Sequence, residues 1–517
     1  MNWMKKIPFW EWVCWVALGI LLVVNSLHLL RGDVFFNTDI ARDFMMLEEM
    51  VANRKISLIG GHSGVGGIFH GPIWYWFSLP FFVLFGGSPA LMGLVWELLY
   101  LASVVGGYFM VKKMLGRQTA LLSTTLWATL TVFFANGMTQ NAPSILLSLL
   151  FFFCLHQYFT NRTMQHLLIG LVVLGIIIQC EIAFGLPILL VTTTYLLWDS
   201  YTQRRFGQLW ALLVLILPLS TYLLFEVRHD FLQLRGAIQY AQAEVPYETW
   251  TLEHYLRGRL RGVVESFAFL RTPVKEIWYG SGVIGMLALG LLWIKRQRFF
   301  KSSSEKTAIR LGVWLVVGFW IATLPFKGDV QSHYYAPLLP ILIMLFVHAL
   351  TKLKHQAWMW FVLIVVVVNT GFAAQSGWRY WLRAETSDFW SWRYYRRMAQ
   401  DIVTDSQSKP FGYYAWSSDL FGYAGKYAMR QVTRHSPGQV AFNQKLPLSY
   451  AFTDFNNASY NPFANPQHWL SEQVGIAQPP TQVWQYAAGG KVYRYQLDEE
   501  AVAQPNDPNL IEGTFFR

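Results

Sequence analysis

The stretch Phe9–Leu30, FWEWVCWVALGILLVVNSLHLL, carries one acidic residue near its start and is otherwise mostly apolar. A helix of about 20 apolar residues is long enough to cross the ~30 Å hydrocarbon core of a bilayer. Further apolar stretches of similar length follow, which predicts about eleven membrane-spanning helices in all. These spans are expected at about 9–30, 89–111, 118–135, 142–159, 165–180, 183–198, 207–225, 278–294, 308–325, 334–350 and 356–374.

The composition also indicates an integral membrane protein. Of the 517 residues, 54% are hydrophobic and 14% are charged, whereas about a quarter are charged in a globular protein. The net charge of +11 does not indicate a nucleic acid partner, because the basic residues stand in short clusters between the spans. Lys and Arg clusters of this kind are retained on the cytoplasmic side. They are Lys5-Lys6, Lys112-Lys113 with Arg117, Arg204-Arg205, Lys295-Arg296 with Arg298, and Lys352 with Lys354.

These clusters predict the orientation of the chain. If the N-terminus is cytoplasmic, every cluster falls on the cytoplasmic side, and the long connections at about 31–88 and 226–277 lie outside. The tail from about 375 then lies outside as well. We therefore expect a membrane domain over 1–374 and an extracytoplasmic domain over 375–517, in the inner membrane of a bacterium.

The tail has the pattern of a small soluble α+β domain. Phe411–Trp416 is typical of a strand, and a helix is expected from Asp419 to Met429. Val483–Tyr486 and Lys491–Tyr495 flank a Gly-Gly turn, which predicts a β-hairpin. Together with the spans, this predicts an all-α polytopic membrane protein that carries an α+β domain at its C-terminal end.

The first external loop holds a cluster of charges, Thr38-Asp39-Ile40-Ala41-Arg42-Asp43. Charges are costly beside a bilayer, so such a cluster is a functional-site hypothesis. The alternative is a solvated loop with a local ion pair. Phe44, Leu47 and Val51 then recur at helical spacing, which predicts a helix lying on the membrane surface.

A second surface helix is expected from Pro72 to Phe85, after the motif Phe69-His70-Gly71-Pro72. The segment is too short for a span, and it begins with Trp74, Tyr75 and Trp76, which favour the membrane interface. The link between the two surface helices, residues 60–67, is rich in glycine. We expect this link to be flexible and to become ordered by a substrate.

Three motifs together resemble a known superfamily. Asp39-x-x-Arg42-Asp43 is followed about thirty residues later by the segment His70–Trp76, and Tyr334-x-x-Pro337-x-x-Pro340 follows Lys327 and His333. In their order along the chain and their predicted place on one side of the membrane, these motifs resemble those of the GT-C glycosyltransferases. The resemblance covers about 9–374 and is strongest to the glycosyltransferase family 39-like group. That group includes protein O-mannosyltransferases and lipid A aminoarabinose transferases. The chain departs from the group at His70, where relatives often have lysine, and at Ile40, where they commonly have an acid.

The resemblance implies the GT-C fold and transfer of a sugar from a polyprenyl-phosphate donor to a hydroxyl of a protein, lipid or glycan acceptor. The reaction would be a direct displacement at the outer face. A carboxylate that accepts the proton of the attacking alcohol accelerates such a step by ~10²–10⁴-fold. Asp39 is the candidate base because it lies nearer the end of the first span. Asp43, one turn later, is the second candidate catalytic residue, which would bind the acceptor, orient Arg42 or serve as the base in place of Asp39.

Cations that meet the developing charge of the phosphate lower the barrier. The candidates are Arg42, His70, Lys327 and His333, with Tyr334 at the start of the matched helix. Three of these cations also have a simpler interpretation. Arg42 would pair only with Asp39 or Asp43, His70 would be a turn residue, and Lys327 would be an interfacial anchor.

Two further places are possible substrate-binding sites. Arg257 and Arg261, with Arg259 between them, suit a phosphate, although a solvated basic face gives the same pattern. Glu181, between two spans, is a candidate ligand of a sugar hydroxyl or an ordinary interfacial charge. We expect no cofactor, and no metal site is predicted because the first loop has no Asp-x-Asp pair.

Two other functions compete with this interpretation. A transporter or flippase of a lipid-linked sugar would place charges near the middle of its spans, whereas here the charged motifs gather in the external connections. An oligosaccharide ligase or polymerase would use a similar scaffold, and the sequence does not separate it from a simple transferase. Neither the sugar nor the acceptor follows from the sequence.

Overall fold

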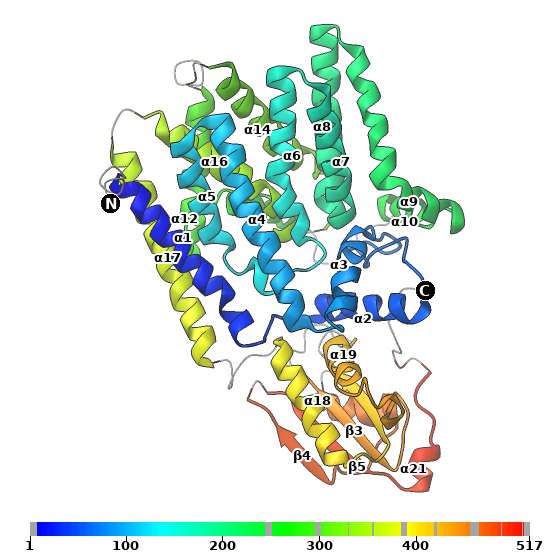
Figure 1. Cartoon of the computed structure of the whole chain (residues 1–517). Helices are drawn as coiled ribbons and strands as arrows, with labels where there is room; N and C mark the ends of the chain where they lie inside the picture. Colours follow the sequence, from blue (N-terminus) through cyan, green and yellow to red (C-terminus); the bar gives the residue numbers. More distant parts are fainter. Residues whose placement is uncertain are drawn as a thin grey trace. The chain divides into compact units, whose positions relative to one another are not determined.

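The computed structural model describes residues 8–242, 251–294, 300, 302–328, 330–353, 356–383, 390–417, 421–454, 465–487, 489–508 and 510 (Figure 1). The chain folds into two compact units. The first unit comprises Met1–Asn25, Ile56–Phe77 and Glu97–Gly377, and the second comprises Ser26–Lys55, Ser78–Trp96 and Trp378–Arg517. The predicted first external loop is thus divided between the units, and the predicted domain border at 374/375 stays a prediction.

Each predicted span coincides with helical structure. Seven of the described helices are long and apolar enough to cross a membrane, so the chain is an integral membrane protein, while the number of eleven spans stays a prediction. The helical segments at the eleven predicted positions are α1 (Phe9–Leu30), α4 (Pro89–Leu115), α5 (Arg117–Thr131), α6 (Ala142–Asn161), α7 (Met164–Cys180), α8 (Ile182–Gln203), η3 (Phe206–Leu215) with α9 (Ile216–Arg228), α12 (Lys275–Ile294), α14 (Ser303–Ala322), α15 (Ser332–Tyr335) with η4 (Ala336–Leu338) and α16 (Leu339–Thr351), and α17 (Ala357–Arg383). Of these, α5, α7, α12 and α14 are not among the seven.

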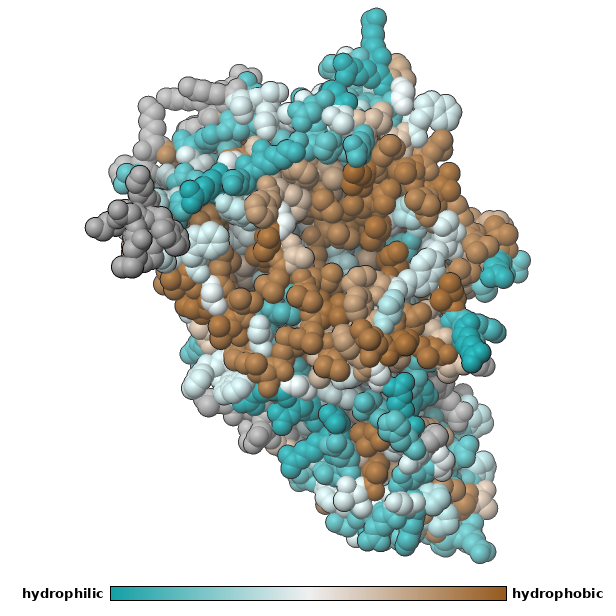
Figure 2. Space-filling view, viewed as in Figure 1, coloured by the Kyte–Doolittle hydropathy of each residue, from teal (hydrophilic) through white to brown (hydrophobic). Residues whose placement is uncertain are grey.

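The core of the first unit is a layer of closely packed helices. In Figure 1, α5, α6, α7, α8, α14 and α16 lie side by side, and residues such as Phe152, Leu174 and Phe319 are fully buried between them. Apolar side chains also cover the outside of these helices (Figure 2), for example Leu186 and Leu190 on α8, each at least 50% exposed. A monomeric soluble protein does not expose apolar area of this extent, so the surface suits lipid.

The first unit also contains shorter helices in its connections. These are η2 (Phe134–Asn136), α10 (Leu232–Gln242) and α11 (Leu252–Ser266). Buried polar groups tie neighbouring helices together. The amide Nδ2 of Asn25 on α1 donates to the Glu97 carboxylate on α4 over 2.6 Å, and the Asn369 amide on α17 donates to Thr129 on α5 over 3.0 Å.

Both helices expected in the first external loop are present. The first is α2 (Thr38–Asn53), which begins where the Asn37 side chain accepts a hydrogen bond from the Ile40 N–H. Phe44 and Leu47 are buried as the periodicity predicts, whereas Val51 is 39% exposed. The second is α3 (Ile73–Leu84). Their position on a membrane surface stays a prediction.

The tail in the second unit forms a five-stranded mixed sheet in the order β2-β1-β3-β5-β4. The strand β1 pairs parallel with β2 and β3, while β5 pairs antiparallel with β3 and β4. Its two central strands β1 and β3 are fully buried, as strands covered on both faces are. The strands are β1 (Phe411–Trp416), β2 (Val440–Phe442), β3 (Leu448–Thr453), β4 (Gln482–Gln485) and β5 (Lys491–Gln496).

The helices of the tail pack beside this sheet (Figure 1). They are α18 (Trp392–Ser406), α19 (Tyr423–Val432), η5 (Pro437–Gln439), α20 (Pro466–Trp469), η6 (Leu470–Val474) and α21 (Glu499–Ala503). The predicted first strand and the hairpin are confirmed. The expected helix is α19, which begins later than predicted, at Tyr423, and Asp419 lies outside the described residues. The predicted fold class, a helical membrane protein with a small α+β tail, is confirmed.

Candidate functional site

The residues singled out in the sequence fall into both units. The acidic turn, defined here as Asp39–Asp43, belongs to the second unit. The other candidates belong to the first unit, namely His70, Glu181, Arg257, Arg261, Lys327, His333 and Tyr334.

The acidic turn is a single charge-paired turn of α2. The guanidinium of Arg42 donates to Asp39 Oδ1 over 3.0 Å and to Asp43 Oδ1 over 3.0 Å through Nη2 and 3.2 Å through Nε. The Asp43 side chain is 5% exposed and the Asp39 side chain is 55% exposed. The simpler interpretation of Arg42, pairing with both acids, therefore describes the structure. Of the two carboxylates, that of Asp39 is the more accessible to a substrate.

In the first unit, the glycine-rich link forms a short hairpin. We use the name glycine hairpin for Gly60–Gly71. His62 and Phe69 pair as an antiparallel bridge, the Gly60 N–H donates to the His70 carbonyl over 2.7 Å, and the His70 N–H donates to the Gly61 carbonyl over 2.9 Å. The expected flexible link is therefore a structured element.

Three buried glutamines from distant parts of the chain hold this hairpin. Gln140 accepts from the Gly61 N–H over 3.0 Å and donates to the Gly71 carbonyl over 3.3 Å. Gln233 on α10 accepts from the Phe69 N–H over 3.0 Å. Gln179, at the end of α7, accepts from the Ile73 N–H over 3.2 Å through its side chain and from the Gly71 N–H over 2.8 Å through its carbonyl.

The glycines of the hairpin are required by this close packing. A Cβ atom on Gly60 would lie 2.4 Å from the Gly71 carbonyl oxygen, and one on Gly71 would lie 2.5 Å from Cγ of Gln179. Both distances are far shorter than any van der Waals contact. The hairpin backbone can therefore approach the glutamines only where no side chain intervenes.

The glycine hairpin brings several candidates near one another. His70 is half-buried on its second strand. A Cβ atom on Gly64 would lie 3.3 Å from the Tyr334 hydroxyl, so Tyr334 lies against the tip of the hairpin. Tyr334 is also near enough to Glu181 to interact with it electrostatically. The structure thus places His70 on the hairpin, Tyr334 against its tip, and Glu181 within electrostatic range of Tyr334.

Glu181 lies in the connection between α7 and α8. Its side chain is 2% exposed and accepts a hydrogen bond from the Ala183 N–H over 3.1 Å, so it caps the start of α8. Burial raises the pKa of the Glu181 carboxyl to about 8, although this hydrogen bond opposes the shift. The neutral acid therefore predominates at pH 7, and a neutral carboxyl can donate as well as accept a hydrogen bond.

Lys327 and His333 differ in their surroundings. The Lys327 ammonium donates to the Ala241 carbonyl in the last turn of α10 over 2.8 Å, and its backbone N–H donates to the Tyr240 hydroxyl over 2.9 Å. A cation is favourable at a helix C-terminus, so Lys327 anchors the end of α10. His333 is exposed and stacks edge-on against Tyr334 with ring centroids 4.4 Å apart.

Arg257 and Arg261 of α11 line an open groove of about 890 Å³ in the first unit. Arg257 pairs with Glu253 over 2.5 Å and Arg261 with Glu265 over 2.7 Å. Arg259 instead turns inward, where it is 7% exposed and donates to the Phe326 carbonyl over 2.5 Å. The groove is also lined by Trp278 and Tyr279 on α12, and by Gln331 and Ser332, which directly precede His333 and Tyr334.

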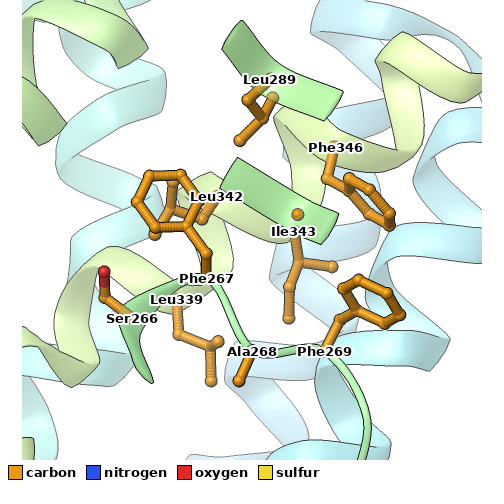
Figure 3. A pocket seen from close by; sticks show the side chains of 10 residues that line it. Ser266, Phe267, Ala268, Phe269, Leu289, Leu339, Leu342, Ile343 and Phe346 are labelled. Carbon is orange, nitrogen blue, oxygen red and sulfur yellow. The ribbon is translucent and has the colours of Figure 1, made fainter. Parts of the chain in front are cut away.

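A second, apolar pocket lies between α12, α16 and the segment after α11 (Figure 3). Its lining includes Phe267, Phe269, Leu342 and Phe346. Its volume of about 10 Å³ holds at most one water, and apolar cavities of this size stay dry. The pocket is therefore a packing gap and is too small to bind a substrate.

The comparisons with known proteins agree with this architecture. A family model described as dolichyl-phosphate-mannose-protein mannosyltransferase matches residues 69–225, which include His70, Gln140, Gln179 and Glu181. The crystal structure of ArnT from Cupriavidus metallidurans bound to undecaprenyl phosphate is similar, with a TM-score of 0.60 and 13% identity over 96% of this chain and 98% of that one. Its apo form is similar too, with a TM-score of 0.59 and 12% identity over the same shares.

The chain has the GT-C fold. The resemblance to GT-C superfamily membrane glycosyltransferases, predicted from the three motifs, is thereby confirmed. Among curated proteins, no relative matches this chain. The sequence reasoning missed the three glutamines, although Gln179 interrupts the apolar run Gly175–Cys180. The sequence signal that could have found Gln179 is a polar residue at the end of an apolar span.

The first prediction concerns the clamp on the glycine hairpin. Gln140→Ala should leave the Gly61 N–H without its buried acceptor, which costs about 1–3 kcal/mol. We expect faster hydrogen–deuterium exchange across Gly60–Gly71 and a lower midpoint of thermal unfolding in detergent. Gln203→Ala, at an exposed position on α8, is the control and should change neither. If hydrogen–deuterium exchange across Gly60–Gly71 is the same in Gln140→Ala and Gln203→Ala, Gln140 does not hold the glycine hairpin.

The second prediction concerns the pH dependence of stability at Glu181. The carboxyl titrates near 4.5 in the unfolded chain and near 8 in the folded one, so its contribution is complete below the lower value and is lost as the pH rises to the higher. Glu181→Gln mimics the neutral form. The midpoint of thermal unfolding of the wild type should therefore fall more steeply between pH ~5 and ~8 than that of the variant. If the unfolding midpoints of the wild type and of Glu181→Gln change with pH in parallel, Glu181 is ionised in the folded protein.

Proposed function

We propose that this chain transfers a glycosyl group from a polyprenyl-phosphate carrier to the hydroxyl of an acceptor. The fold supports this proposal, since a structure of ArnT with the same fold holds undecaprenyl phosphate. The family description, which names a dolichyl-phosphate-linked sugar, supports it as well. The single observation that carries the mechanism is the acidic turn, in which one exposed and one buried carboxylate share an arginine.

In the proposed reaction, Asp39 is the general base. The acceptor oxygen forms a bond to the anomeric carbon of the sugar while the bond between that carbon and the phosphate oxygen breaks. The proton of the acceptor hydroxyl passes to the Asp39 carboxylate, and the lipid leaves as a phosphate monoester. The Asp39 side chain is 55% exposed and binds Arg42 through one oxygen, Oδ1, so an acceptor hydroxyl can reach the carboxylate, which suits this role.

Asp43 is proposed to orient Arg42. It is buried, and its Oδ1 accepts two of the guanidinium hydrogen bonds. A planar guanidinium held in this way has a fixed orientation. The positive charge of Arg42 can then stabilise the donor phosphate as negative charge develops on that phosphate.

The candidates in the first unit are proposed to bind the donor phosphate and the sugar. His70 and Tyr334 lie at the glycine hairpin, and His333 stacks on Tyr334. Arg257 and Arg261 border a groove that is large enough for a lipid headgroup. Lys327 is the weakest of these candidates, because its ammonium is already bound to the Ala241 carbonyl.

The orientation is part of the proposal. The basic clusters support a cytoplasmic N-terminus and an acceptor on the opposite face. Both the acidic turn and the glycine hairpin belong to the connection that follows the first span, which would then lie outside the bacterial inner membrane. The same chemistry would serve an oligosaccharide ligase or polymerase, because these differ in the acceptor rather than in the base.

The third prediction tests the base. Asp39→Asn keeps the shape of the side chain but cannot accept the proton, so transfer should fall by at least ~10²-fold, about 2.7 kcal/mol of barrier. The variant should still bind the donor, as measured by calorimetry in detergent. Glu49→Gln makes the same chemical change on the same helix and should leave transfer unaltered.

The variant Asp43→Asn distinguishes the roles of the two acids, Asp39 and Asp43. If Asp43 only orients Arg42, the variant should lower transfer less than Asp39→Asn does. Near-full turnover of Asp39→Asn together with loss of turnover in Asp43→Asn would assign the base to Asp43. If neither variant lowers transfer, the acidic turn is not the catalytic site.

A further inference from the structure

The start of the first external loop is paired with the C-terminal tail within the second unit. The Trp392 N–H donates to the Val34 carbonyl over 2.9 Å, and the Phe36 N–H donates to the Trp390 carbonyl over 2.5 Å. Phe35 and Ser391 form an antiparallel bridge between them. A segment only a few residues before the acidic turn is therefore fixed by residues far away in the sequence.

Asp33 is the centre of this pairing. Its side chain is fully buried, at 0% exposure. Oδ1 accepts from the Arg393 N–H over 2.9 Å and from the Val34 N–H over 3.0 Å, and Oδ2 accepts from the Tyr380 hydroxyl over 3.2 Å. Because Arg393 lies in the first turn of α18, the carboxylate also meets the positive end of that helix.

The pairing continues into an aromatic cluster that reaches α2. Phe36 is 0% exposed and contacts Phe44 on α2, Trp392 on α18 and Tyr427 on α19, with ring centroids 5.1–5.7 Å apart. The next residue, Asn37, caps α2. Asp33, Phe36 and Asn37 thus connect the first turn of α18 directly to the first turn of α2.

The opposite part of α2 is held by α19. Phe44 packs edge-on against Tyr427 at 5.3 Å, and Glu48 pairs with Arg430 over 3.1 Å. Figure 1 shows α2 and α19 adjacent to each other. The tail therefore contacts α2 on both sides of the acidic turn: near its N-terminus, and at Phe44 and Glu48, one and five residues after Asp43.

We propose that Asp33 is a positioning residue for the transfer reaction, and that the C-terminal tail acts through it as a rigid support for the acidic turn. Asp33 does not touch substrate in this role. It fixes the direction from which the chain enters α2, and through it the place of the Asp39 carboxylate. The effect on rate rests on the proposed function, in which Asp39 is the base, whereas the effect on α2 order does not.

The expected consequence follows from the sensitivity of catalysis to geometry. A reacting group displaced by about 1 Å can cost ~10²-fold in rate. Loss of the Asp33 carboxylate leaves the buried N–H of Val34 and the partly buried N–H of Arg393 without this acceptor, and this loosens the start of α2. An amide in its place can still accept those hydrogen bonds. Burial raises the pKa of Asp33, although its hydrogen bonds with Arg393, Ser391, Tyr380 and Val34 oppose the shift.

The experiment compares Asp33→Ala, Asp33→Asn and Tyr486→Phe in the full-length protein. Tyr486→Phe removes a hydrogen bond to Asp401 elsewhere in the tail and serves as the control. We expect Asp33→Ala to speed hydrogen–deuterium exchange over Thr38–Asn53 and to lower kcat by ~10–100-fold with KM for the donor little changed. Asp33→Asn should show the exchange over Thr38–Asn53 and the kcat of the wild type. The control Tyr486→Phe should change neither quantity.

The outcomes separate this inference from the proposed function. If exchange over Thr38–Asn53 rises in Asp33→Ala but Asp39→Asn retains transfer, the support exists and the assignment of the base is wrong. If exchange over α2 does not change, Asp33 does not position α2 and the inference fails. It also fails if Asp33→Asn is as impaired as Asp33→Ala, since the hydrogen bonds alone would then not explain the effect.

Discussion

Inside a bilayer, every backbone N–H and C=O must find its partner within the protein, because lipid offers none. This constraint gives the first unit its long apolar helices and confines irregular backbone to the connections between them. Reactive side chains are confined in the same way, since charges within the hydrocarbon are costly. The candidate groups of this chain accordingly stand at helix ends and in loops, with Asp39 at the start of α2 and Glu181 between α7 and α8.

Chemistry placed in loops needs another source of rigidity, and buried polar side chains supply it here. Gln140, Gln179 and Gln233 hold the glycine hairpin in the first unit. Asp33 serves the same purpose before α2 in the second unit. In both cases one side chain satisfies backbone groups that the loop cannot pair within itself, which is how a segment without regular structure can keep one conformation. A structured loop also needs no ordering by the substrate, and this lowers the entropic cost of binding.

The sequence predicted those features that depend on local pattern. Long apolar runs located the spans, and the periodicity of Phe44 and Leu47 located α2. The Gly-Gly turn located the β4–β5 hairpin. The features that depend on distant partners were not predicted. Residues 60–67 have the composition of a flexible link, and nothing near them in the sequence reveals the glutamines 79 to 164 residues away. Asp33 likewise appears as an ordinary polar residue after a span until its partner Arg393 is known.

The most direct test of the central claim is a transfer assay on the purified protein in liposomes, with a panel of polyprenyl-phosphate hexoses and pentoses and a membrane extract as the acceptor pool. Mass spectrometry would follow both products. A glycosyltransferase should yield one polyprenyl phosphate for each sugar that appears on an acceptor. Movement of an intact lipid-linked sugar across the bilayer, with no glycosylated product from any donor, would contradict the assignment and identify a transporter built on the same fold.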